Sequence, residues 1–179
     1  MTGSIDPACG VAHGAAAEGP IGRVLVAVFA SPVSSFLLRY GADCGYATVL
    51  VEPDGARAAA AEVLGGTTVS GFAELVGVLP DGAADVVVTD HHRDELGPVL
   101  RDALARPVRW VGVMGNPRHD GPHVAALAAL GVPPEEVARV HRPIGLDIGS
   151  RAPAEIAIST LAGLLADRNG RSGGFAHGG

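Results

Sequence analysis

The sequence contains no lysine, because all 13 of its basic residues are arginine. This absence excludes a lysine Schiff base, the phosphate-binding lysine of a P-loop and a lysine general base. Aromatic residues make up only 4% of the chain, so its core must be aliphatic. The 2 cysteines, Cys9 and Cys44, are too few for a disulfide framework or a thiolate metal cage. A net charge of −6 argues against a nucleic-acid-binding surface, which needs a basic face.

No apolar run approaches the roughly 20 residues that a membrane-spanning helix needs. The N-terminus has no basic segment followed by an apolar stretch, so no secretory signal is predicted and we expect a cytoplasmic protein. With 179 residues, 47% of them hydrophobic, the chain can bury one substantial core. Residues 1–20 and 169–179, rich in glycine and other small residues, are expected to be flexible segments flanking one domain over residues 21–168.

Short apolar runs alternate with helical segments along this domain. Strands are predicted at residues 23–29, 47–51, 84–88 and 108–113, with a weaker one at 67–69. Their nearly continuous, β-branched sequences suit strands that are buried on both faces. Helices are predicted at residues 32–42, 56–64, 94–104, 119–130 and 153–167. The alternation predicts an α/β fold: a Rossmann-like, doubly wound and mainly parallel sheet with helices on both faces.

The turn after the first strand is where a Rossmann fold binds a dinucleotide, but here it contains no glycine. It reads FASPVSS from Phe29 onward, and Pro32 removes one backbone donor. The serines of this turn, Ser31 and Ser34 among them, either hold a single phosphate at a helix N-terminus or only cap the helix. Glu52 ends the second strand, where a carboxylate accepts a ribose hydroxyl in dinucleotide-binding proteins. Without the glycines, NAD(P) binding is disfavoured.

Two further polar segments follow predicted strands. Residues 89–95 (TDHHRDE) place Asp90, His91 and His92 together, either as proton-transfer or metal-binding groups or as a polar loop in which an aspartate caps the next helix. No motif supplies a third ligand, so no metal site is predicted. At the end of the strand at 108–113, Gly112 and Gly115 permit close approach of a ligand or of another strand. Arg118, at the start of the next helix, either clamps an anion or is an exposed arginine.

Three other features complete the pattern. His119 and His123 share one face of a predicted helix, where we interpret them as surface residues or supports for a site. Trp110 lies inside a predicted strand and is expected in the core. The segment 141–151 (HRPIGLDIGSR) is irregular and punctuated by glycine, as functional loops often are. Its alternative role is a structural crossover in which Asp147 bonds local amides.

This last segment carries a family resemblance. Residues 141–149 (HRPIGLDIG) and 152–159 (APAEIAIS) resemble the signature near the C-terminus of the XdhC/CoxI family, and residues 111–118 (VGVMGNPR) resemble its "iGllGS-x-R" stretch, with Asn116 where serine is usual. The resemblance spans residues 23–167. It implies a Rossmann-like C-terminal domain of a maturation factor for molybdenum hydroxylases such as xanthine dehydrogenase and carbon monoxide dehydrogenase. Such factors bind the molybdenum cofactor (molybdopterin), help its sulfuration and deliver it to the apo-enzyme.

The sequence departs from the family's usual pattern in three places. No counterpart of the N-terminal domain, with its cysteine after paired glycines, precedes the first predicted strand, so that cysteine's role is not carried onto Cys9. The first turn is usually glycine-rich in the family. The family's Thr-His-Asp after the fourth strand appears here as Thr89-Asp90-His91. We therefore expect the partner to be a molybdenum hydroxylase client or a separate chain of the XdhC N-terminal type, and we expect homodimerisation through a sheet edge or helix pair.

Together these observations predict an accessory protein that binds rather than turns over, because no residues form a set of nucleophile, base and orienting group. Two alternatives stay open: an NAD(P)-dependent oxidoreductase that uses Glu52, and a partner-binding scaffold without a cofactor. No nucleic-acid or membrane partner is expected. The predicted cofactor-binding residues are Ser31, Ser34, Glu52, Gly115, Asn116, Arg118, Gly145, Asp147 and Gly149.

Overall fold

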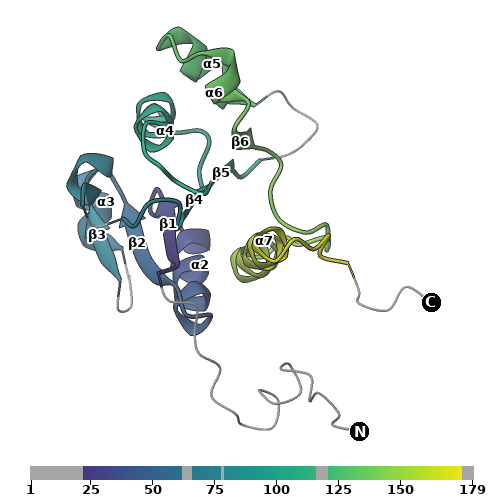
Figure 1. Cartoon of the computed structure of the whole chain (residues 1–179). Coiled ribbons are helices and arrows are strands. Elements are labelled where there is room, and N and C mark those ends of the chain that lie inside the picture. The colour runs from purple at the N-terminus through teal and green to yellow at the C-terminus, as the bar shows by residue number, and fades with distance from the viewer. Residues whose placement is uncertain (1–21, 62–65, 78, 116–120, 175–179) are drawn as a thin grey trace, which may run out of the picture.

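The computed structural model describes residues 22–61, 66–77, 79–115 and 121–174. A sheet of 6 strands forms its centre, with every neighbouring pair parallel, in the order β3-β2-β1-β4-β5-β6 (Figure 1). The strands are β1 (Val24–Val28), β2 (Ala47–Val51), β3 (Thr67–Val69), β4 (Ala84–Val88), β5 (Trp110–Val113) and β6 (Val140–His141). The helices are α2 (Pro32–Asp43), α3 (Gly55–Ala60), the 3-10 turn η1 (Phe72–Leu75), α4 (Leu96–Leu104), α5 (Pro122–Ala129), α6 (Pro134–Val137) and α7 (Pro153–Arg168).

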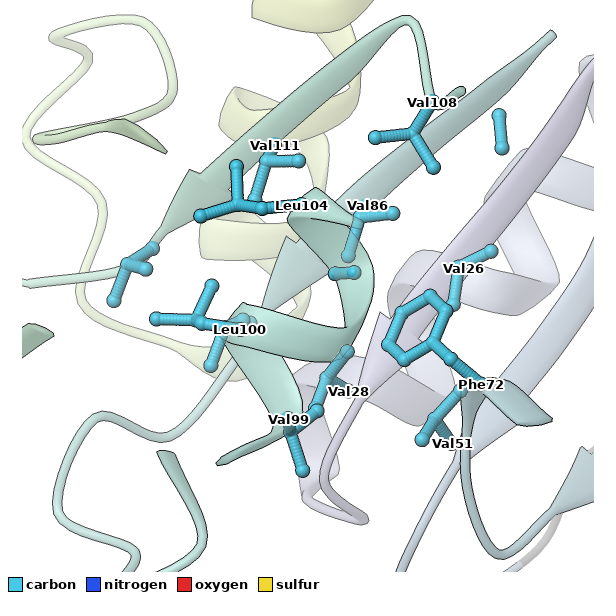
Figure 2. Packing of buried hydrophobic residues seen from close by; sticks show 14 of the residues in the cluster. Val26, Val28, Val51, Phe72, Val86, Val99, Leu100, Leu104, Val108 and Val111 are labelled. Atoms are coloured by element: carbon cyan, nitrogen blue, oxygen red, sulfur yellow. The ribbon is translucent and has the colours of Figure 1, made fainter. Parts of the chain in front are cut away.

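The sheet is buried on both faces, as its apolar strands require. In β1 the side chains alternate: Val26 and Val28 join a core with η1, α4 and α5, whereas Leu25 and Ala27 join a core with α2 and α7. Figure 2 shows the first of these cores, where Phe72 and the α4 leucines pack on strand valines. On the other face, α2 and α7 pack against each other. Each fully buried aliphatic side chain contributes about 1.5–3 kcal/mol to this packing.

The predicted α/β fold is confirmed, and all of the predicted strands are present with small shifts at their ends. The prediction missed β6, η1 and α6, which are too short to show a period. The predicted helix 56–64 is wrong at its end, because α3 stops at Ala60; residues 62–64 lie outside the described part, as do 119 and 120 of the predicted helix 119–130. None of the described helices is long and apolar enough to cross a membrane.

Local chemistry fixes the helix ends. Ser31 caps α2 and Pro32 takes its first position, as predicted. At the start of α7 the Glu155 carboxylate accepts the N–H groups of residues 151 and 152 at 3.0 and 3.1 Å, and these bonds hold its pKa below the usual range. Gly170, with φ +63°, ends the same helix. For the loop at residues 89–95, the alternative in which Asp90 or Asp94 caps α4 is wrong in that detail, because Glu95 holds the cap position and its side chain makes no cap bond.

Candidate functional site

The strand order reverses between β1 and β4, because β1 leads outward to β2 and β3 while β4 leads to β5 and β6 on the other side. Ligands of open α/β sheets bind at this switch point, beyond the carboxyl ends of the strands. The loops after β1 and β4 are joined there: the Ser31 hydroxyl donates to Thr89 Oγ1 at 3.1 Å. Thr89 Oγ1 in turn lies 3.0 and 2.9 Å from the carbonyl oxygens of Val28 and Phe29. The switch point is therefore a hydrogen-bonded unit.

Both predicted serines are engaged by the α2 N-terminus itself. Ser31 Oγ accepts the Ser34 N–H at 3.0 Å, and Ser34 Oγ accepts the Ser31 N–H at 2.8 Å. Ser34 Oγ also donates to the Ser31 carbonyl at 2.8 Å, and its side chain is buried. These bonds occupy the N–H groups of Ser31 and Ser34, two of the donors that a phosphate at the start of this helix would use.

The glycine-free turn is accommodated by an unusual backbone at Phe29, which has φ +73°. A residue other than glycine in this region costs of order 1–3 kcal/mol and persists only when its surroundings hold it there. The Phe29 ring is fully buried, and the Arg93 guanidinium lies over it at 4.7 Å from the ring centroid. The left-handed conformation that glycine usually supplies is thus held by packing.

Glu52 occupies the expected position at the end of β2, and its carboxylate is surrounded by donors from the protein. It accepts the N–H groups of Ala30 at 2.7 Å and Asp54 at 2.9 Å, and Arg93 Nη2 lies 3.1 Å away. The Glu52 side chain is 0% exposed and that of Arg93 only 9%. Glu95 is bonded to the same guanidinium, and this hydrogen bond is the largest of the causes that lower the pKa of Glu95. Glu52 can reach a ribose only after Arg93 is displaced.

The ends of β4, β5 and β6 form the other half of this edge. Gly115, after β5, lies against Arg142, after β6: a Cβ at Gly115 would come within 2.6 Å of Arg142 Nε and Nη2. The missing side chain of Gly115 thus leaves the space that the Arg142 guanidinium fills, and its predicted contact with a ligand stays a prediction. Asn116 and Arg118 lie outside the described residues, so their predicted contacts stay predictions.

The loop that carries Gly145, Asp147 and Gly149 connects β6 to α7. Gly145 has φ +90°, and a Cβ there would lie 2.4 Å from Ser159 Oγ on α7. Ser159 Oγ donates to the Leu146 carbonyl at 3.0 Å, which fixes the loop on the helix. Asp147 and Gly149 are exposed. The alternative in which Asp147 bonds local amides is wrong, because its side chain makes no hydrogen bond to the part of the chain that the structure describes.

Sequence reasoning gave no role to two side chains at this edge, Arg93 and Arg142. Arg93 and Arg142 stand inside the segments that were singled out, but only the fold shows that they converge on Glu52 and Gly115. His123 was given two interpretations: because it is only 6% exposed, that of a surface residue is wrong, and that of a support for a site stays a prediction. Trp110 is partly buried, with its ring stacked on that of His141 at 5.0 Å. Across residues 22–61, 66–77, 79–115 and 121–174, no group of three His, Cys, Asp or Glu side chains could hold a metal ion.

Two histidines at this edge have pKa values below the usual range. Burial, then the charges of His92 and Arg142, lower the pKa of His91, while Asp90 and a backbone hydrogen bond at Met114 oppose the shift. Burial and then Arg142 lower the pKa of His123. Both rings are therefore held neutral in the folded chain at pH values where an unfolded chain begins to protonate its histidines, near 6.5.

These lowered pKa values predict a pH-dependent stability. As pH falls from 7 through 6.5 toward the folded pKa values, the unfolded chain binds more protons than the folded one, so the free energy of unfolding falls. His123→Gln, which cannot titrate, should flatten this dependence in urea unfolding at pH 7.5, 6.5 and 5.5. The control His141→Gln removes an exposed imidazole and should keep the wild-type slope. Equal slopes in both variants would contradict the assignment of this slope to His123.

The geometry defines a doubly wound α/β domain whose candidate site lies at the carboxyl edge of the sheet. Residues 25–164 match the XdhC Rossmann domain family, and the chain belongs to that family. The uncharacterized protein YqeB of Escherichia coli (strain K12) is 32% identical over 102 residues, which are 57% of this chain and 18% of YqeB. A crystal structure described as a xanthine dehydrogenase from Bacillus halodurans superposes with a TM-score of 0.61 at 21% identity, covering 84% of this chain and 44% of that one. The chain thus spans less than half of either protein.

Proposed function

We propose that this chain is an accessory protein in the maturation of a molybdenum hydroxylase, working in the cytoplasm by binding the molybdenum cofactor and the client enzyme. The observation that carries this proposal is the family match, which runs from β1 to α7 and so takes in every loop of the candidate site. The description of the Bacillus halodurans neighbour as a xanthine dehydrogenase supports the client class. Sulfuration or insertion of the cofactor is the step in which we place the chain.

The donors present at the sheet edge decide where such a cofactor would fit. The cofactor carries a phosphate, which needs cationic or N–H donors. The α2 N-terminus fits poorly, because Ser31 and Ser34 cap each other and the buried Glu52 carboxylate lies beside them. The ends of β4 to β6 fit better, because Arg142 and the unpartnered imidazole nitrogen of His123 lie there. The polar edges of the pterin would then face the loops after β4 and β5.

Binding, rather than turnover, is the activity we assign to this domain. Glu52, the carboxylate best placed for chemistry, is 0% exposed and bonded to Arg93. The same contacts weigh against an NAD(P)-dependent oxidoreductase, because a ribose hydroxyl would have to compete with a guanidinium for a carboxylate that has no exposed surface. A client enzyme, a separate chain of the XdhC N-terminal type or a second copy would complete the assembly.

Native mass spectrometry tests this proposal. The purified chain is offered the molybdenum cofactor and NAD(P) together under anaerobic conditions. A stoichiometric pterin adduct is expected. A nucleotide adduct would instead support the oxidoreductase, and the absence of both adducts together with client binding would identify a scaffold that holds no cofactor. The variant Arg93→Met removes the residue that covers Glu52, so if the chain binds a nucleotide through Glu52, this variant should show more of the nucleotide adduct than the wild type.

A further inference from the structure

A cavity of about 270 Å³ lies on the α7 face of the sheet, beside the outer strands β5 and β6. The core on this face joins α2 and α7 to β1, β2 and β4, and Trp110 of β5 packs against it while staying partly buried. Trp110 and His141 line the cavity from the sheet side. The loop at residues 143–146, which leads from β6 toward α7 (Figure 1), lines a second side, and α7 with residues 171 and 172 lines the rest.

Printed contacts between the loop and α7 hold the walls of this cavity in place. The Leu146 N–H donates to the Ser159 carbonyl at 3.1 Å, and the Ser159 hydroxyl donates back to the Leu146 carbonyl at 3.0 Å. Gly145 packs directly on the helix, because a Cβ at Gly163 would lie 3.4 Å from Gly145 Cα. The cavity is therefore formed before any ligand arrives, which lowers the entropic cost of binding.

Two stacked rings give the cavity a flat aromatic surface. The centroids of the Trp110 and His141 rings are 5.0 Å apart, and their planes differ by only 8°. The Trp110 ring has room because Gly112 has no side chain: a Cβ there would overlap the ring. Trp110 covers one face of the His141 ring, and His141 is an exposed residue, so its other face is open to a further planar ring.

The α7 wall carries a buried hydroxyl that points to a ligand with a polar atom. Thr160, Gly163, Leu164 and Asp167 all line the cavity, and their i, i+3, i+4, i+7 spacing places them on one face of the helix. Thr160 is only 2% exposed, and within the described residues its hydroxyl makes no hydrogen bond. Buried polar groups are rarely left without a partner. A ligand atom that bonds to this hydroxyl would satisfy it.

The charged groups at the open end of the cavity favour an acidic substituent. Arg171 is exposed there, and its guanidinium forms no ion pair with the part of the chain that the structure describes. The nearby Asp167 carboxylate is already bonded to Arg109 at 2.6 Å. The Arg171 N–H donates to the Ala166 carbonyl at 2.8 Å, which holds this arginine at the end of α7. A carboxylate or phosphate on the ligand would find Arg171 available.

We propose that this cavity binds a small planar heteroaromatic acid of one or two rings. The ring stacks on the Trp110–His141 pair, a polar atom at its edge bonds to the Thr160 hydroxyl, and its acidic group lies beside Arg171. A cavity of about 150 Å³ is enough to hold benzene, so this one leaves room for a second ring or a substituent. Apolar walls with a few placed polar groups are typical of small-molecule sites. The inference goes beyond the proposed function, because it concerns the α7 face of the sheet and requires no molybdenum cofactor.

The first test uses the whole chain and quinoline-2-carboxylate, a two-ring heteroaromatic acid. Trp110 is the only tryptophan of the sequence, so its indole N–H gives a single signal in a ¹⁵N-correlated spectrum. We expect quinoline-2-carboxylate to shift this signal saturably. Cyclohexanecarboxylate, which has the same charge but no flat ring, should leave it in place. A signal that does not shift saturably with the quinoline, or that both carboxylates shift alike, would overturn the proposal.

Calorimetry of variants with the same probe gives the second test. Thr160→Val removes the hydroxyl at nearly constant volume and should weaken binding about fivefold, as loss of one hydrogen bond does. Its matched control is Thr68→Val, an exposed threonine of β3 at the opposite edge of the sheet. His141→Leu should also weaken binding about fivefold, whereas His141→Phe keeps a flat ring and should retain the affinity.

Wild-type affinity in both Thr160→Val and His141→Leu would overturn the proposal, as would an equal loss in Thr160→Val and Thr68→Val. Should Thr160→Val fail to fold, the comparison of His141→Leu with His141→Phe decides, because position 141 is exposed and either side chain can be accommodated there. In that comparison, equal affinities of the leucine and phenylalanine variants would contradict ring stacking as the mode of binding.

Discussion

Replacing Asp85 by asparagine is expected to lower the free energy of unfolding by about 3–5 kcal/mol, because it removes the negative charge from a buried ion network. Asp85 lies on β4 with a fully buried side chain. Its carboxylate accepts Arg109 Nε at 2.5 Å and Arg168 Nη2 at 2.8 Å. Arg109 also bonds to Asp167 at 2.6 Å. Because Asp167 and Arg168 are the last residues of α7, the network around Asp85 links β4 to the end of that helix.

Urea unfolding of Asp85→Asn measures this effect, and Asp102→Asn is the matched control. Asp102 also pairs with an arginine, Arg101, at 2.9 Å, but both side chains are about half exposed. Surface pairs of this kind contribute about 0–1 kcal/mol. The titration of Tyr46 gives a second readout. Burial is the largest cause that raises the pKa of Tyr46, and the charge of Asp85 is the next, so this pKa should fall in Asp85→Asn. If Asp85→Asn and Asp102→Asn lowered the free energy of unfolding by similar amounts, the stabilising role of the buried network would be contradicted.

Arg93→Met is expected to destabilise the chain by a similar amount, about 3–5 kcal/mol, because it leaves the Glu52 carboxylate buried without a cation. The Glu52 side chain has no exposed surface, so water cannot replace the guanidinium without a local rearrangement. The N–H groups of Ala30 and Asp54 remain as donors but carry no full charge. The variant also removes the cation over the Phe29 ring, which helps to hold the φ +73° backbone.

A double-variant cycle separates the charge effect from lost packing. Glu52→Gln combined with Arg93→Met removes both charges, and we expect it to recover much of the stability lost in Arg93→Met alone. Glu95→Gln, which removes the other, 39% exposed partner of Arg93, should cost less than about 1 kcal/mol. If the double variant lost as much free energy of unfolding as Glu52→Gln and Arg93→Met lose together, the two side chains would not interact as a pair.

The sequence predicted the sheet well because each long strand is a nearly continuous apolar run, interrupted only by Thr48 in β2 and Asp85 in β4. It predicted the α2 start equally well, since Ser31-Pro32 combines an N-cap and a first-position proline. It did not predict β6, because Val140–His141 is only 2 residues long and its pairing with β5 is set by tertiary contacts. Short elements of this kind carry no period to detect.

The site was only partly predictable for a related reason. The spacing of Glu52 after the first turn located the right position, but its partner Arg93 comes 41 residues later, and no local pattern joins the two. His123 lies in an alanine-rich helix, where both faces look alike from the sequence, and only the packing of α5 shows that the ring is buried. The glycine-free turn suggested a lost phosphate loop, whereas the structure keeps the left-handed backbone at Phe29.

Transfer of the molybdenum cofactor to a cofactor-free molybdenum hydroxylase tests the proposed function most directly. The cofactor is supplied anaerobically either free or premixed with the chain, and the activity of the enzyme is followed over time. We predict faster and more complete activation with the chain present, together with a complex of chain and apo-enzyme detectable by size-exclusion chromatography. Activation that is no faster than with free cofactor, with no complex formed, would contradict the assignment of this domain to cofactor delivery.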